Sequence, residues 1–200
     1  MMRLRTVLPV TAVIMITASP LNAAETAALS PVPDQTVFAF AGVMHAGHFS
    51  DSLEFWNGPY EANVAIGAGY QNFFYSYGSF GLGVEVGAAL RTGESTSGEI
   101  WAGGVARLTT FEVGPLNITP SLTAGFSVVT DPIGVEAVRA RENSASPYFL
   151  YYLSPEIAVS HDNAPEIEVF GRIHHRSGGF GTIAHLDGSN AAVVGIRYRF

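Results

Sequence analysis

A serine and two histidines lie close together near the C-terminal end of the sequence. The stretch RIHHRSGGFG, residues 172–181, contains His174, His175 and Ser177. A serine hydroxyl becomes a nucleophile when a neighbouring imidazole removes its proton, so these residue types are suited to the hydrolysis of an ester. The same residues are also compatible with polar side chains at the end of a strand. The place of the stretch in the fold decides between the two interpretations.

The first residues and the composition indicate an exported protein. Only 14% of the residues are charged, against roughly 25% in soluble domains. Arg3 and Arg5, the uncharged run 6–18 and the small residues up to Ala23 have the three-part pattern of a secretory signal peptide, with cleavage expected after Ala23. The apolar run is shorter than the stretch of about 20 residues that a membrane-spanning helix needs. We therefore predict a signal peptide over 1–23 and export by the general secretory route.

Charge and cysteine content exclude other classes of protein. The formal net charge is −7, and removal of the two leader arginines lowers it to −9. A nucleic-acid-binding protein calls for a basic patch or stripe, so this balance predicts no nucleic-acid partner. The chain has no cysteine, so its stability depends on backbone pairing and packing rather than on disulfides.

Apolar and polar residues alternate with a period of two through the rest of the chain. In residues 80–91, for example, apolar side chains at the even positions alternate with small or charged ones at the odd positions. This period indicates strands rather than helices. Eight segments have the pattern: 36–46, 60–75, 80–91, 98–111, 116–129, 147–160, 166–177 and 189–200. Their lengths suit tilted strands that cross a membrane.

The connections between these segments alternate between short and long. The short ones are 76–79, 112–115 and 161–165, and the long ones are 47–59, 92–97, 130–146 and 178–188. Short turns on one side and long loops on the other are typical of outer-membrane barrels. We therefore predict an all-β fold, an eight-stranded antiparallel transmembrane β-barrel of the outer-membrane type, monomeric, over 36–200, with a short periplasmic segment over 24–35. A soluble β-sandwich is the remote alternative.

The C-terminal strand carries a further signal of this class. Val194, Ile196, Tyr198 and Phe200 alternate with small and basic residues, and the chain ends at Phe200. A terminal phenylalanine after alternating apolar residues resembles the assembly signal of outer-membrane barrel proteins. The resemblance implies that the barrel-assembly machinery is a partner and that the protein lies in the bacterial outer membrane.

In such a barrel the small or charged side of each strand faces inward. The charged residues expected inside are Glu85, Arg107, Glu156, Glu168, Arg172 and Arg197. A barrel of eight strands is only wide enough for side chains to fill it, which argues against a diffusion pore.

The same alternation assigns the faces of the seventh segment, 166–177. With the N-terminus on the periplasmic side, this segment runs outward, and Arg172 shares the inner face with His174 and Arg176. His175 and Ser177 then point toward lipid near the outer leaflet. Polar groups that face hydrocarbon are costly unless they are compensated, so their presence there favours a function.

The barrel pattern, the His-x-Ser of His175 and Ser177 near the outer end of the seventh strand, and the closing strand to Phe200 resemble the outer-membrane lipid A 3-O-deacylases, which are acyloxyacyl hydrolase-like eight-stranded barrels. The resemblance implies an esterase whose partner is the lipid A of lipopolysaccharide in the outer leaflet. It implies that Ser177 attacks an acyl ester and that His175 takes its proton. The backbone N–H groups of Gly178 and Gly179 are candidates for the oxyanion hole.

Two positions depart from the family's pattern. The family has an Asn directly after the serine, where this chain has Gly178, and a Glu on the return side of the last hairpin, where this chain has Ser189. The candidates for the group that orients the histidine are Asp187 first, then Ser189 and Glu142. The alternative function is a non-enzymatic small barrel with a structural or adhesion role, in which the His-Ser pair is a relic.

Other histidines and arginines are weaker candidates for sites. His45 and His48 flank the first long connection, but no acid shares a close ligand spacing with them, so we expect scattered rim histidines and neither a metal nor another cofactor. Arg139 and Arg141 in the third long loop could bind lipid A phosphates as guanidinium forks. A solvated loop explains them equally well.

Overall fold

The structure is a computed structural model, and it describes residues 34–54 and 58–200. The predicted signal peptide and residues 24–33 of the predicted periplasmic segment lie outside these residues. The strands are β1 (Gln35–His45), β2 (Tyr60–Tyr77), β3 (Phe80–Gly93), β4 (Ser97–Arg107), β5 (Phe111–Val113), β6 (Leu116–Val129), β7 (Phe149–His161), β8 (Ala164–Ser177) and β9 (Asp187–Arg199). The helices of the described residues are α1 (Phe49–Ser52) and α2 (Gly134–Glu142).

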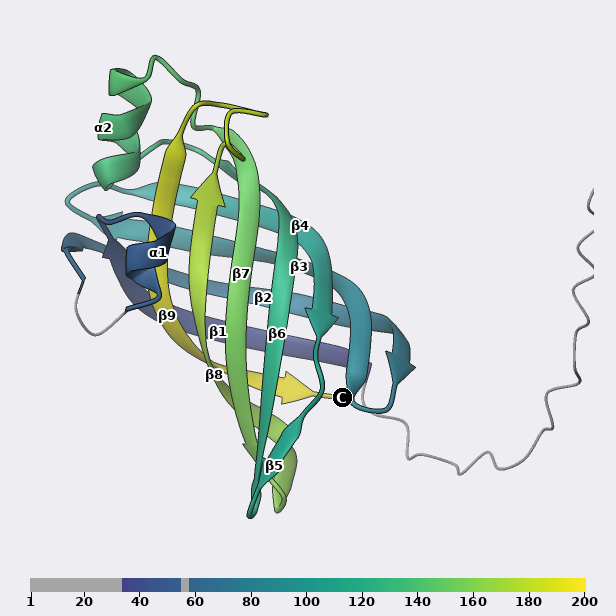
Figure 1. Ribbon diagram of the computed structural model, residues 1–200. Coiled ribbons are helices and arrows are strands. Elements are labelled where there is room, and N and C mark those ends of the chain that lie inside the picture. The colour runs from purple at the N-terminus through teal and green to yellow at the C-terminus, as the bar shows by residue number, and fades with distance from the viewer. Residues whose placement is uncertain (1–33, 55–57) are drawn as a thin grey trace, which may run out of the picture. The chain divides into compact units, whose positions relative to one another are not determined.

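The strands form one closed antiparallel barrel (Figure 1). Their order in the sheet is β4-β3-β2-β1-β9-β8-β7-β6-β5, and a further pairing of β4 with β6 closes the ring. Eight strands make up the wall, because β5 pairs only with β6, beyond the end of β4. The predicted eight-stranded β-barrel is confirmed.

One predicted strand boundary is wrong. The fourth predicted segment, 98–111, splits into β4, which ends at Arg107, and the separate β5. Leu108 donates its backbone N–H to Pro120 O (2.9 Å), and the chain then turns into the short β5–β6 hairpin. Gly114 in that turn has a φ of +61°, a conformation that glycine adopts without steric cost.

The two ends of the barrel differ in their connections. The long connections from β1 to β2, from β6 to β7 and from β8 to β9 gather at one end, here called the loop end, and most tight turns gather at the other, the turn end (Figure 1). The predicted long connection 92–97 is wrong, because only the three residues 94–96 separate β3 from β4 at the loop end. The asymmetry otherwise matches the prediction, but α1 and α2 were predicted as loop. Within the described residues, no helix is long and apolar enough to cross a membrane.

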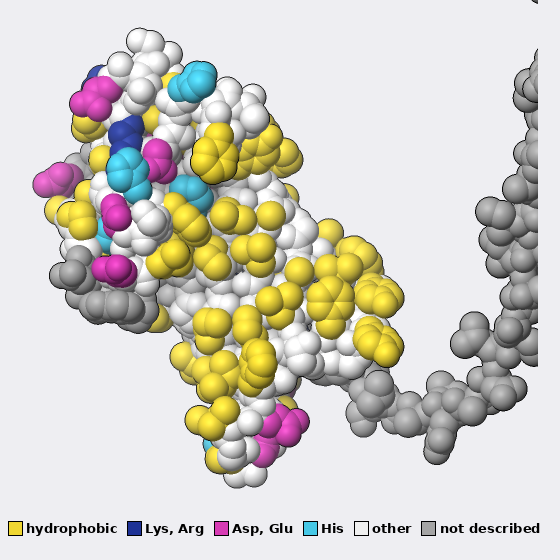
Figure 2. Space-filling view, in the orientation of Figure 1, with side chains coloured by type: hydrophobic (Ala, Val, Ile, Leu, Met, Phe, Trp, Pro, Cys, Tyr) yellow, Lys and Arg dark blue, Asp and Glu magenta, His cyan; other side chains and the backbone are white. Residues whose placement is uncertain are grey.

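The outer surface of the wall is apolar and the inner surface is polar. Val169 of β8 and Val194 of β9 are 60% and 68% exposed, and apolar side chains cover much of the barrel side in Figure 2, while charged ones gather toward the loop end. Since an apolar belt around a closed barrel is what the hydrocarbon of a bilayer requires, the fold is that of a membrane-spanning barrel.

Buried ion pairs fill the lumen. Arg172 bonds to Glu85 Oε1 (3.0 Å) and to Glu156 Oε2 (2.7 Å), and Arg197 bonds to Glu156 (2.8 Å) and to Glu168 (3.0 Å). All the residues expected inside, Arg107 among them, are buried. The predicted polar interior is therefore confirmed.

Candidate functional site

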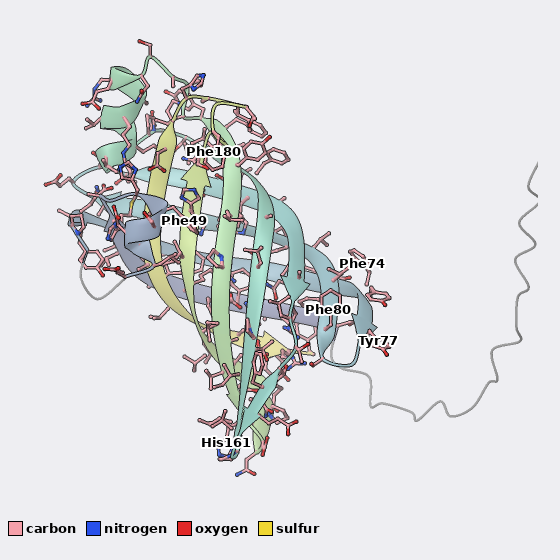
Figure 3. The ribbon with its side chains drawn as sticks, viewed as in Figure 1. Phe49, Phe74, Tyr77, Phe80, His161 and Phe180 are labelled. Atoms are coloured by element: carbon pink, nitrogen blue, oxygen red, sulfur yellow. The ribbon has the colours of Figure 1, made fainter. Side chains whose placement is uncertain are left out.

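The His-x-Ser stretch lies where β8 reaches the loop end. Arg176, between the two residues, is fully buried in the lumen. Because neighbours in a strand point to opposite faces, His175 and Ser177 point away from the lumen. The faces predicted for this strand are therefore confirmed. Figure 3 places Phe49 and Phe180 at the same end of the barrel as this stretch.

Among residues 34–54 and 58–200, the hydrogen-bond partner of the His175 side chain is the side chain of Asn190 in β9. The imidazole Nδ1 lies 2.6 Å from Asn190 Oδ1, and the two residues are opposite each other in the β8–β9 register. Asn190 Nδ2 donates to the backbone carbonyl of Gly47 (3.0 Å). That bond fixes which end of the amide faces the histidine, so Nδ1 carries the proton and donates it to Oδ1. The Nε2 lone pair is left to accept a proton.

None of the three residues predicted to orient His175 contacts it. Ser189 is buried on the lumen side, where its hydroxyl accepts a bond from Arg91 Nη1 (3.0 Å). Asp187 accepts a hydrogen bond from His48 Nδ1. Glu142 is exposed at the end of α2. The prediction is corrected to Asn190, which the alternation of β9 could have identified, because even-numbered residues of that strand face outward.

A bulge in β9 produces this arrangement. His175 pairs with Asn190 but Ser177 pairs with Asp187, so β9 has one residue more than β8 between the two pairs. A bulge re-aims the side chains around it and is common next to active sites. The family's spacing from the serine points to Ser189, and the extra residue explains why the outward-facing residue is one position further along.

The oxyanion donors are only partly available. Gly178 N–H donates to Leu186 O (2.7 Å), which makes the prediction that it binds an oxyanion wrong. Gly179 has a φ of +62°, and among the described residues its N–H makes no hydrogen bond. A Cβ at Gly178 would lie 1.8 Å from Ala184 O, so the family's Asn does not fit in this loop. Gly179 is the remaining predicted donor.

The first long connection covers the histidine. The Phe49 ring of α1 lies 4.6 Å from the His175 ring, centroid to centroid, and His175 is only 6% exposed. His45, opposite Asn190 on the other side of β9, is fully buried. Tyr151 of β7 stands opposite Ser177. The Phe49 ring therefore covers His175, and Tyr151 borders Ser177 on the β7 side.

The remaining candidates make other contacts. Within residues 34–54 and 58–200, no three histidine or acidic side chains are grouped to hold a metal ion. His48 pairs with Asp187, and His174 lies in the lumen with Glu99 (2.9 Å). Arg139 donates to four backbone carbonyls, so its guanidinium is neither a free phosphate clamp nor part of a solvated loop, whereas Arg141 is exposed.

The arrangement can perform nucleophilic chemistry without a charged third group. A neutral imidazole with its Nδ1 proton held by an amide oxygen has its second nitrogen free, as in the Cys-His-Asn sites of some hydrolases. Ser177 lies two residues from that imidazole on the same face of β8.

No family model matches the sequence, and no curated protein matches it. Among solved structures, the outer membrane enzyme PagL aligns at a TM-score of 0.55 and 11% identity, over 82% of this chain and 99% of PagL. Neisserial surface protein A (NspA) aligns at 0.47 and 15%, over 84% of this chain and 97% of its own. The N-terminal β-barrel domain of Pseudomonas aeruginosa OprF aligns at 0.47 and 9%, over 84% and 99%. The likeness to PagL shows that this chain has the fold of the small eight-stranded outer-membrane barrels.

Proposed function

We propose that the barrel is a serine esterase of the outer membrane that removes an ester-linked acyl chain from lipid A. The observation that carries the proposal is the hydrogen bond from His175 Nδ1 to Asn190 Oδ1 on the lipid-facing side of the wall, the side that also holds Ser177. The stability of a barrel in a membrane does not require polar side chains such as His175, Asn190 and Ser177 on that face.

In the proposed reaction, His175 Nε2 takes the Ser177 proton while the serine Oγ forms a bond to the acyl carbonyl carbon. Gly179 N–H stabilises the oxyanion of the tetrahedral intermediate. The C–O bond to the sugar breaks, and the imidazolium returns the proton to the departing sugar hydroxyl. Water then attacks the acyl-serine with the same histidine as base, which releases a fatty acid and restores the serine.

Three features support lipid A as the substrate. The His-x-Ser stretch resembles that of the lipid A 3-O-deacylases, and the chain shares its fold with the outer membrane enzyme PagL. The site lies at the loop end, which faces outward in barrels of this class. Acyl chains in the outer leaflet would then lie against the same wall as Ser177, beside the ring of Tyr151.

Location and assembly follow from the same proposal. The chain is exported by the general secretory route, inserted by the barrel-assembly machinery through β9 and the Phe200 that follows it, and acts as a monomer. The second candidate function is a non-enzymatic barrel with a structural or adhesion role. The covering of His175 by Phe49 favours it, because a base in use must be reached by substrate.

Mass spectrometry of lipid A tests the proposal. Cells that express the intact chain should lose one hydroxyacyl mass from lipid A, and cells with Ser177→Ala at equal outer-membrane abundance should not. Ser95→Ala, an exposed serine in a loop at the same end, is the matched control and should behave as the intact chain.

Labelling separates the alternatives. A fluorophosphonate that modifies Ser177 in the purified barrel, together with unchanged lipid A, would retain the esterase and exclude lipid A as its substrate under those conditions. No labelling and no change in lipid A would contradict the enzyme and favour the structural barrel.

A further inference from the structure

We propose that Arg139 of α2 is a positioning residue that sets the orientation of the His175 imidazole through Gly47 and Asn190. The expected effect of Arg139 on the rate rests on the proposed function. Its expected effect on which imidazole nitrogen carries the proton does not.

The guanidinium of Arg139 ties two separate segments together. Its Nη1 donates to Asp187 O (3.2 Å) and Gly188 O (3.1 Å), and its Nη2 donates to Ala46 O (2.9 Å) and Gly47 O (3.3 Å). The first two carbonyls belong to the bulge in β9, and the other two follow the end of β1. A planar guanidinium presents its donors in a fixed fork, so it holds both segments at one spacing.

One of these carbonyls also determines the orientation of Asn190. Gly47 O accepts from Asn190 Nδ2 (3.0 Å) as well as from Arg139. With Nδ2 held there, Oδ1 faces His175. Were the amide turned over, its NH2 would face Nδ1, and the imidazole proton would move to Nε2. In that tautomer Nε2 has no lone pair for the serine proton, and the lone pair on Nδ1 accepts from the amide. The position of Gly47 O therefore decides whether His175 Nε2 can act as a base.

The same helix also holds the strand from inside the barrel. Glu136, three residues before Arg139 and thus on a neighbouring position of the helix surface, bonds to Arg176 Nη1 and to Arg91 Nη2 (2.8 Å). Arg176 is the residue between His175 and Ser177. Contacts from α2 therefore reach the end of β8 through the lumen and the bulge of β9 from the loop side.

The chain offers a matched control on α2. Arg141 is two residues further along, is exposed and carries the same charge. A loss of loop charge would affect Arg139→Gln and Arg141→Gln equally, whereas a positioning role predicts an effect for Arg139→Gln alone. Arg139→Lys retains the charge but not the fork, so it should restore part of the wild-type behaviour.

The test measures hydrolysis of purified lipid A in detergent micelles and the nitrogen-15 NMR signals of His175 in the same folded barrels. For Arg139→Gln we expect kcat to fall about 10- to 100-fold, with KM changed less than about threefold. We expect the His175 signals to move from the Nδ1–H tautomer toward a mixture. Arg141→Gln should match the wild type in kcat and in the His175 signals, and Arg139→Lys should lie between.

The spectrum separates this inference from the proposed function. An unchanged His175 tautomer in Arg139→Gln overturns the inference, whatever the rate. A shifted tautomer in a barrel whose wild type does not hydrolyse lipid A supports the positioning of His175 and contradicts the proposed function. Where Arg139→Gln does not fold, the comparison of Arg139→Lys with the wild type decides by the same criteria.

Discussion

The inner and outer faces of β8 at residues 175–177 differ in how their polar groups are bonded. On the inner face, Arg176 bonds to Ser127 Oγ (2.5 Å), to Glu136 and to Pro147 O (2.9 Å). On the outer face, the His175 side chain is hydrogen-bonded to a neutral amide within the part of the chain that the structure describes. On the inner face, the buried charge of Arg176 is therefore paired with the carboxylate of Glu136, as a buried charge requires. The outer face holds an imidazole and a serine two residues apart, which stability alone does not explain.

The comparison predicts that the inner face supports stability and the outer face supports activity. The largest effect on stability is expected for Arg172→Ala, which leaves Glu85 buried without its ion-pair partner and Glu156 with Arg197 as its remaining one. Its free energy of unfolding should fall by about 3–5 kcal/mol. Guanidinium unfolding in phospholipid vesicles, followed by tryptophan fluorescence, measures the change.

A residue on the opposite face of the same strand provides the control for that prediction. Val169 is exposed toward lipid, so Val169→Ala should change the free energy of unfolding by less than about 1 kcal/mol. Equal losses for Arg172→Ala and Val169→Ala would contradict the division between the two faces.

An intermediate effect, on activity rather than stability, is expected for Asn190→Leu. The apolar side chain removes the acceptor of the His175 Nδ1 proton, so kcat on lipid A should fall about 10- to 100-fold. Gly47 O retains its bond from Arg139 (3.3 Å), so the free energy of unfolding should change by about 1 kcal/mol.

Asn117→Leu is the corresponding control. Asn117 is half-buried at the turn end, where it bonds to Asp162 (2.8 Å), and its substitution should leave the rate unchanged. An Asn190→Leu barrel with wild-type kcat would remove Asn190 from the mechanism and return the orienting role to an unidentified group.

The sequence predicts the wall well because a strand's period of two reports directly which side chains face lipid and which face the lumen. Alternation placed Arg172 inside and His175 outside, as found. It does not report helices within loops, so α2 and the contacts of Arg139 were missed. It also does not report a bulge, which changes which residue stands opposite His175 without disturbing the pattern on either side.

The loop after Ser177 shows a second limit of sequence comparison. Compared with the family, Gly178 stands where an Asn side chain would donate to the oxyanion. In the structure, the Gly178 N–H bonds to Leu186 O, and Ala184 O lies too close to leave room for a Cβ. Both features of the glycine serve to close the loop. Such a close approach depends on residues six and eight positions away, and no local motif records it.

The smallest effect is expected for Gly178→Ala, and it tests whether the loop belongs with the framework or with the site. A Cβ at Gly178 would lie 1.8 Å from Ala184 O, so the loop must shift and carry the Gly179 N–H with it. Because the loop lies outside the wall, we expect the free energy of unfolding to fall by only about 1 kcal/mol, with a severalfold loss of kcat on lipid A. Gly171→Ala, at a lipid-facing position of β8 where the nearest atom to a Cβ is Val193 O at 4.0 Å, should alter neither quantity. If Gly178→Ala instead lowered the free energy of unfolding as much as Arg172→Ala, the loop would be part of the stabilising framework. The division between an inner face that supports stability and an outer face that supports activity would then not hold for the residue next to Ser177.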